Sequence, residues 1–169
     1  MLVGHLAPIG AIATAAQHRW PTHSPRWTRA LPWLAAGLGA IFPDLDIIVN
    51  LLLTGRFYHL YYFPHSLFVY LPILILGILL LRAPRARWVG LTLLTLCAGV
   101  FSHLLLDVVS HGTPLFFPFY RGLIGWTFPG TGEPLLVAYA RSPNVWLEVV
   151  TIIVGLIWLA RYLYSRLLT

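Results

Sequence analysis

Three polar residues spaced four apart are the clearest candidates for chemistry in this chain. His103, Asp107 and His111 lie in the apolar stretch 88–111, where burying an aspartate costs about 2.5–3.5 kcal/mol at mid-membrane. On a helix, side chains at positions i, i+4 and i+8 lie along one stripe, so all three point the same way. The spacing lets an imidazole and a carboxylate reach one cation, which predicts a metal site. It also fits a His103–Asp107 hydrogen bond without metal.

A second pair of acids, Asp44 and Asp46, directly follows Pro43 within the apolar stretch 31–53. Proline lacks the backbone N–H and favours a kink or break in the helix. On a regular helix, residues two apart diverge by about 200°, so both aspartates reach one site only if the helix unwinds. Otherwise one aspartate is a ligand and the other caps the following half-helix.

Histidines elsewhere in the chain extend the candidate set, since Cys97 is the only cysteine and offers no thiolate cluster. His5 lies near the start, His59 lies in a connection, and His65 begins an apolar segment. A lone histidine in a membrane is more often a hydrogen-bond donor between helices than a metal ligand. Any metal here must be held by histidine and aspartate.

The composition places these residues in a membrane. Of 169 residues, 59% are hydrophobic and only 9% are charged, far from the balance of a soluble domain. The net charge of +6 comes from arginines scattered between apolar runs, a pattern that argues against nucleic-acid binding. The length suits a single domain, 1–169.

We expect an all-α integral membrane bundle of about five short transmembrane helices. The first and third are shorter than the roughly 20 residues that cross a bilayer, which neighbouring helices or local thinning can accommodate. The first lacks a basic leader region and is expected to be retained. The second is expected to break at Pro43, and a long apolar outer loop spans 112–144. The expected segments are 1–16, 31–53, 66–81, 88–111 and 145–165.

The arginines predict the orientation. Most lie in the connections 17–30 and 82–87 and at the C-terminal end, which share one side if the chain crosses five times. The positive-inside tendency then places the N-terminus outside and the C-terminus in the cytoplasm. All the candidate histidines and acids named above then fall toward the outer leaflet. This convergence disfavours a metal or proton transporter, because the inner halves of the segments lack the acids and histidines that a path to the other side needs.

Three stretches resemble the YdjM-like membrane-bound metal-dependent hydrolases: Leu38-Gly-Ala-Ile-Phe-Pro-Asp-Leu-Asp46, Pro64-His-Ser-Leu67 and Phe101-Ser-His-Leu-Leu-Leu-Asp107. The resemblance runs from His5 to Arg121 and implies a prokaryotic plasma (inner) membrane protein. As metal ligands it implies Asp44, Asp46, His65, His103 and Asp107, with His5 added. The chain departs from the family pattern where a His-Arg-Gly element is missing. His59 lies one residue out of register there, which leaves its role open.

A looser similarity to zinc-dependent phospholipase C suggests phosphoesters as the substrate class. We therefore expect a hydrolase that cleaves a lipid or lipid-linked phosphoester at the outer interface by a metal-activated water. Histidine and carboxylate ligands suit one or two Zn²⁺ ions, or Mn²⁺ or Fe. The expected catalytic and metal residues are His5, Asp44, Asp46, His65, His103, Asp107 and His111.

Two further roles and one alternative complete the expectation. His111 or Asp46 is expected as a general base, and Arg56 or Arg121 as the contact for an anionic headgroup. Membrane lipids are the expected surroundings and partners. The alternative is a non-catalytic membrane subunit with a structural or relic metal site.

Overall fold

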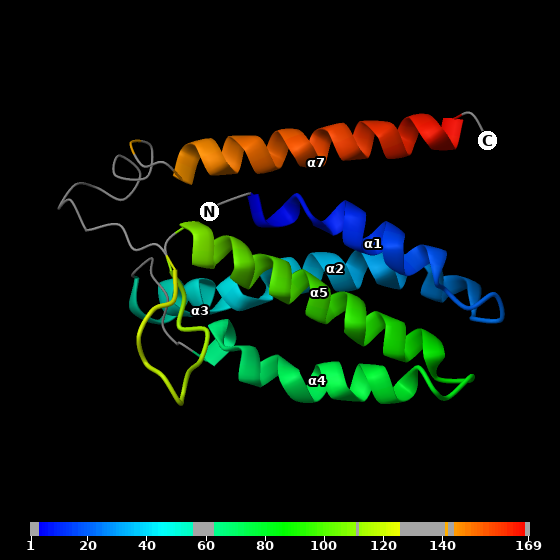
Figure 1. Ribbon diagram of the computed structural model, residues 1–169, viewed down its shortest axis with the longest axis horizontal. Coiled ribbons are helices and arrows are strands. Elements are labelled where there is room, and N and C mark those ends of the chain that lie inside the picture. The colour runs from blue at the N-terminus through cyan, green and yellow to red at the C-terminus, as the bar shows by residue number, and fades with distance from the viewer. Residues whose placement is uncertain (1–3, 56–62, 111, 126–140, 142–143, 168–169) are drawn as a thin grey trace.

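A computed structural model describes residues 4–55, 63–110, 112–125, 141 and 144–167, and over these residues the chain is helical apart from turns and one isolated β-bridge. Each expected segment contains a helix, and α1, α2, α4 and α5 run alongside one another with α7 along one side (Figure 1). The all-α membrane bundle predicted from the sequence is confirmed. The elements are η1 (Gly4–Leu6), α1 (Ile9–His18), η2 (Arg26–Ala30), α2 (Leu31–Ile41), η3 (Phe42–Asp44), α3 (Leu45–Thr54), η4 (Phe63–His65), α4 (Leu67–Leu80), α5 (Arg87–Ser110) and α7 (Asn144–Leu167).

The predicted break in the second segment is present. Helix α2 ends at Ile41, the single 3₁₀ turn η3 contains Pro43, and α3 continues to Thr54. Gly55 caps the C-terminus of α3, and its φ of 70° lies in the left-handed region that glycine adopts without a side-chain penalty. Because proline has no N–H to donate, the backbone tightens into the 3₁₀ turn at the point where the acidic pair begins.

Helices α2 and α5 form the closest pair in the bundle because glycines face each other there. A Cβ placed on Gly39 would collide with the carbonyl oxygen of Leu96, and one on Gly99 with that of Ala36. Small residues that let two backbones touch are typical of helix pairs in membranes, where lipid supplies no hydrophobic drive for association. This contact sets η3 beside the second half of α5.

Within the part of the chain that the structure describes, three helical stretches are long and apolar enough to cross a membrane: Arg26–Thr54, Arg87–Ser110 and Val145–Tyr162. Helix α4 is a shorter apolar helix. At 1.5 Å per residue, α1 is about 15 Å long and α4 about 21 Å, both short of the roughly 30 Å hydrocarbon core. As predicted, the first and third segments are the short ones. Helix α5 contacts both of them as well as α2, and it forms the centre of the bundle.

The connection after α5 folds back onto the start of α4. Thr113 and Ile124 form an antiparallel bridge, and the Leu67 N–H donates to the Leu115 carbonyl at 3.0 Å. The Ser66 hydroxyl donates to the Phe117 carbonyl and accepts from an N–H of the first turn of α4, so it caps this helix. Within the predicted loop 112–144, residues 126–140 and 142–143 lie outside the described part of the chain.

Candidate metal centre

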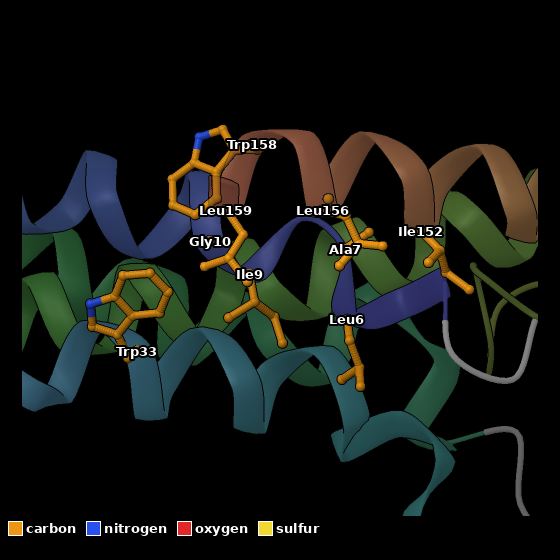
Figure 2. Close-up of a pocket in the computed structure, with 10 residues that line it drawn as sticks. Leu6, Ala7, Ile9, Gly10, Trp33, Ile152, Leu156, Trp158 and Leu159 are labelled. Carbon is orange, nitrogen blue, oxygen red and sulfur yellow. The ribbon is translucent and has the colours of Figure 1, made fainter. Parts of the chain in front are cut away.

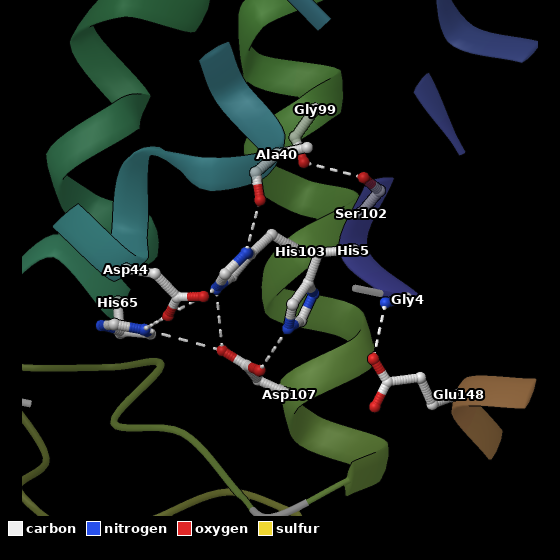
Figure 3. A network of polar contacts seen from close by, with 10 residues as sticks. All are labelled: Gly4, His5, Ala40, Asp44, His65, Gly99, Ser102, His103, Asp107 and Glu148. Carbon is white, nitrogen blue, oxygen red and sulfur yellow. Dashed lines mark hydrogen bonds and ion pairs between the residues drawn. The ribbon is translucent and has the colours of Figure 1, made fainter. Parts of the chain in front are cut away.

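Five histidines and aspartates, distant in sequence, meet near the C-terminal end of α5 (Figure 3). They form two groups of metal-ligating size, His5 with His103 and Asp107, and Asp44 with His65 and His103. Within each group the ligand atoms lie within 4.8 Å of one another. Four of the five are buried, whereas the Asp44 side chain is 34% exposed. The cluster is therefore closed on most sides and open beside Asp44.

Local structure explains how each side chain reaches the cluster. His103 and Asp107 lie four residues apart on one stripe of α5, with Nε2 and Oδ2 3.1 Å apart. The turn η3 presents Asp44, and η4 presents His65 just before the capped start of α4. The Tyr70 hydroxyl donates to the carbonyl of Pro64 at 2.7 Å. This bond fastens η4 to α4 and so fixes the position of His65.

The tautomer of His103 follows from its backbone partner. Its Nδ1 lies 2.7 Å from the carbonyl oxygen of Ala40, which can only accept, so Nδ1–H donates. Ala40 is three residues before Pro43, which has no N–H to give it in a 3₁₀ turn. In the neutral ring Nε2 then carries a lone pair, and it faces Asp44 Oδ1 at 3.5 Å and Asp107 Oδ2 at 3.1 Å. A nitrogen lone pair and two carboxylates share this space, an arrangement that a cation stabilises.

The spacing of these atoms fits a metal ion better than direct hydrogen bonds. His65 Nε2 lies 3.6 Å from both Asp44 Oδ1 and Asp107 Oδ2, and the two His103 contacts are 3.5 and 3.1 Å. Hydrogen bonds between a charged nitrogen and a carboxylate are typically about 2.7–2.9 Å long. With zinc bonds of about 2.0–2.1 Å, neighbouring ligand atoms of a tetrahedron lie about 3.3–3.4 Å apart. The four separations between the nitrogens of His65 and His103 and the oxygens of Asp44 and Asp107 are close to that value, although Asp44 and Asp107 belong to different groups of ligands.

The charge of the cluster also favours a bound metal ion. The carboxylates of Asp44 and Asp107 bring two negative charges into a largely buried site beside the imidazoles of His65 and His103. Buried charges need a counter-charge or a metal, because desolvation is otherwise not repaid. One divalent cation would balance the two carboxylates.

His5 approaches the cluster from the other side of Asp107. Its Nε2 is 3.2 Å from Asp107 Oδ1, and its ring stacks on His103 with centroids 3.8 Å apart and planes at 19°. One imidazole nitrogen has a single lone pair, so His103 Nε2 cannot bind two ions at once. His5 and Asp107 could therefore help to hold a second ion, or His5 could donate a hydrogen bond that orients Asp107.

Other residues expected from the sequence lie elsewhere. Asp46 is buried in the first turn of α3 and belongs to neither group of the described residues, because the helix resumes at Leu45 and turns it away from Asp44. It lies where a carboxylate favours the helix dipole. Arg121 is exposed on the segment 112–125, outside the buried cluster. Arg56, His59 and His111 fall outside the described residues.

Some polar groups around the cluster were not anticipated. Glu148 of α7 is buried, and its Oε1 accepts from the Gly4 N–H at 3.3 Å, next to His5 (Figure 3). Its position within the fifth apolar segment is the sequence signal for this acid, because a carboxylate inside a membrane is costly and usually has a partner. The Ala40 carbonyl and the Tyr70 hydroxyl carried no such signal, since their roles depend on tertiary contacts.

Comparison with known proteins adds a family. The sequence model of the family described as YdjM inner membrane protein matches residues 1–167, nearly the whole chain. No curated protein and no solved structure gave a significant match.

Proposed function

The chain belongs to the YdjM inner membrane protein family, and we propose that it is a membrane-embedded hydrolase that uses a divalent metal to cleave a phosphoester. The family and the apolar helices make it a multi-pass inner membrane protein. The observation that carries the proposal is the set of four separations, 3.1 to 3.6 Å, between the nitrogens of His65 and His103 and the oxygens of Asp44 and Asp107. The substrate would be a lipid or a lipid-linked molecule.

The donor set bears on the identity of the metal. Imidazole nitrogens together with carboxylates suit Zn²⁺, and also Mn²⁺ or Fe, whereas Mg²⁺ and Ca²⁺ prefer oxygen ligands throughout. Asp44, His65 and His103 would hold one ion, and Asp107 with His5 would offer a place for a second. When bound, such a metal supplies an acidified water and stabilises the charge that develops on a phosphoryl oxygen.

Residues of the chain would orient the metal ligands, admit the substrate and bind its headgroup. The Ala40 carbonyl orients the His103 ring so that Nε2 faces the cluster. His5 Nε2 contacts Asp107 Oδ1 and would restrain that carboxylate. The partial exposure of Asp44 marks the side from which a phosphoester would enter. Arg121, exposed on the segment that packs on the start of α4, is our proposed contact for an anionic headgroup.

We also propose that the cluster faces the outer leaflet. His103 and Asp107 lie 16 and 20 residues beyond Arg87, the first residue of α5, or about 24 and 30 Å along a helix. Arg82 and Arg85 lie beside that start, so the arginine-rich connection and the cluster are at opposite ends of α5. The positive-inside tendency puts this connection in the cytoplasm. A cysteine introduced at Arg85 should resist a membrane-impermeant maleimide in intact cells and react after lysis; labelling in intact cells would refute the orientation.

The second candidate function is a non-catalytic structural metal site, because most of the ligand side chains are buried. His103 and Asp107 are 0% and 1% exposed, and structural zinc sites are closed, whereas catalytic ones keep an open position. The opening beside Asp44 is what distinguishes the catalytic proposal. A structural site would lose stability on metal removal and have no hydrolytic activity to lose.

Metal analysis combined with an activity assay tests the proposal. Protein purified in detergent without chelators should contain at least one equivalent of metal and hydrolyse a phosphodiester such as bis(p-nitrophenyl) phosphate. Asp44→Asn, at the open side, should abolish turnover while the chain still folds, as judged by its helical circular dichroism. Substoichiometric metal would refute the metal centre, and full metal without turnover on soluble and lipid phosphodiesters would favour the structural site.

A further inference from the structure

Helix α7 carries a buried acid that the proposed metal centre does not use. Glu148 is 8% exposed and lies within the stretch Val145–Tyr162 that could cross a membrane. A carboxylate at membrane depth is costly and needs a partner. Its Oε1 accepts a hydrogen bond from the Gly4 N–H at 3.3 Å, next to His5 (Figure 3). Glu148 therefore joins α7 to the short segment that carries His5.

The bond acts on the 3₁₀ turn η1, in which His5 is the central residue. The first N–H groups of a helical turn have no partner within it, and the carboxylate of Glu148 satisfies one of them. The Gly4 carbonyl in turn accepts from the Ala7 N–H at 3.1 Å. Gly4 is thus held through both its N–H and its carbonyl, so the turn around His5 is closed and tied to α7.

Apolar packing holds the same two segments together but specifies their position less closely. A Cβ on Gly155 of α7 would meet the Cα and Cβ of Ala7 at 3.1 Å. Beside this contact is an apolar pocket of about 290 Å³, lined by Leu6 and Ala7 on one side and by Ile152 and Leu156 on the other (Figure 2). Apolar contacts are non-directional, whereas a hydrogen bond fixes distance and angle. The bond from Gly4 is therefore the specific constraint on η1.

The position of η1 matters because His5 makes close contacts within the cluster. Its Nε2 is 3.2 Å from Asp107 Oδ1, and its ring stacks on that of His103 with centroids 3.8 Å apart. Hydrogen bonds from nitrogen to oxygen are about 2.7–3.2 Å long, so a small outward shift of η1 would lose the contact with Asp107. Whatever holds η1 therefore also holds His5 on the carboxylate.

We propose that Glu148 is a positioning residue of the metal centre: it holds η1 on α7, and η1 holds His5 against Asp107 and His103. The proposal rests on the proposed function for its metal, whereas the hold on His5 needs no ion. Glu148 belongs to neither metal-sized group of the described residues, and it acts through the Gly4 N–H, as outer groups that orient metal ligands do. It is needed as a hydrogen-bond acceptor and not as a charge.

The accessibility of His5 in chelator is the first readout. Diethyl pyrocarbonate acylates accessible imidazoles, and peptide mass spectrometry of the full chain in mild detergent would follow His5, with the exposed His18 and His23 as internal references. Glu148→Ala should raise the rate at His5 roughly tenfold, as one lost hydrogen bond to a charged group favours local opening. Glu148→Gln keeps an acceptor oxygen, and Ile152→Ala removes only packing, so both should keep the wild-type rate.

The affinity for Zn²⁺ is the second readout, measured by competition with a chromogenic chelator. Glu148→Ala should weaken binding roughly tenfold. In a His5→Gln background the same substitution should have no further effect, because Glu148 acts only through His5. An equal loss in both backgrounds, or an unchanged affinity in Glu148→Ala, would overturn the proposal. Circular dichroism identical to wild type would show that the variants fold.

The two readouts separate this proposal from the hydrolase proposal. If Glu148→Gln exposes His5 as much as Glu148→Ala does, the role as a hydrogen-bond acceptor is wrong. A protein that binds no zinc but shows faster modification of His5 in Glu148→Ala would remove the metal centre and leave the hold on His5. Bound zinc with equal modification of His5 in Glu148→Ala and wild type would remove only the positioning role.

Discussion

Replacing Asp107 by asparagine should change stability in a way that depends on metal. Asp44 Oδ1 and Asp107 Oδ2 lie 3.5 and 3.1 Å from the same nitrogen, so they are at most about 6.6 Å apart. At that distance two ionised carboxylates repel by about 2.5 kcal/mol at an effective dielectric constant of 20. Asp107→Asn removes this repulsion from the metal-free protein, and from the metal-bound protein it removes the central ligand.

The expected result is therefore a sign change. In chelator at pH 8, Asp107→Asn should be at least as stable as the wild type, because it removes a repulsion of at least about 2.5 kcal/mol, which by itself corresponds to about 5–10 °C in Tm. With Zn²⁺ at 100 times its Kd, the wild type should gain about 2.7 kcal/mol and the variant almost nothing. Thermal unfolding of detergent-solubilised protein, followed by circular dichroism with and without metal, measures both effects.

The matched control is Asp46→Asn, because Asp46 is also a buried acid of the acidic pair but belongs to neither metal-sized group. It should keep the full metal-induced rise in Tm. If Asp107→Asn instead lowers Tm equally with and without metal, the cluster is a set of histidine–carboxylate ion pairs and the metal reasoning fails. Loss of the rise in Asp46→Asn would return Asp46 to the ligand set.

Three further substitutions probe the surroundings of the cluster. Tyr70→Phe removes the hydrogen bond to Pro64 and should cost about 0.5–1.5 kcal/mol, with about 10- to 100-fold weaker metal binding by calorimetry. Gly99→Ala drives a methyl into the Ala36 carbonyl and should destabilise the bundle by about 1–3 kcal/mol in thermal unfolding; an unchanged Tm would contradict the close α2–α5 contact. His5→Gln should lower the metal count by one if His5 holds a second ion, and otherwise only weaken affinity.

Much of the fold and part of the site could be predicted because they depend on local rules. The membrane segments follow from apolar runs that only a bilayer can solvate, and the interruption at Phe42–Asp44 follows from the missing N–H of Pro43. The pairing of His103 with Asp107 follows from helix periodicity. The membrane topology predicts that the distant histidines lie at a similar depth in the membrane. It does not predict which residue each histidine contacts.

The depth of a residue in the membrane does not determine which residues it contacts. Packing between neighbouring segments determines those contacts. Asp44 and Asp46 are equivalent in sequence, but only the turn η3 shows which one faces His103 and His65. The Ala40 carbonyl selects the nitrogen of His103 that faces the carboxylates, a role that no residue type encodes. Glu148 meets Gly4 across 144 positions of chain. These contacts depend on how each helix is rotated against the next.

By itself, then, the sequence determined a multi-pass helical membrane protein, its broken second segment and the identity of the polar residues that must be satisfied inside it. The tertiary structure alone decided which of those residues share one point and at what separation. The physical reason is that hydropathy and periodicity act along one chain segment, whereas helix rotation is set by close packing between segments. Here the contact of Gly39 and Gly99 between α2 and α5 sets that rotation and brings Asp44 to His103.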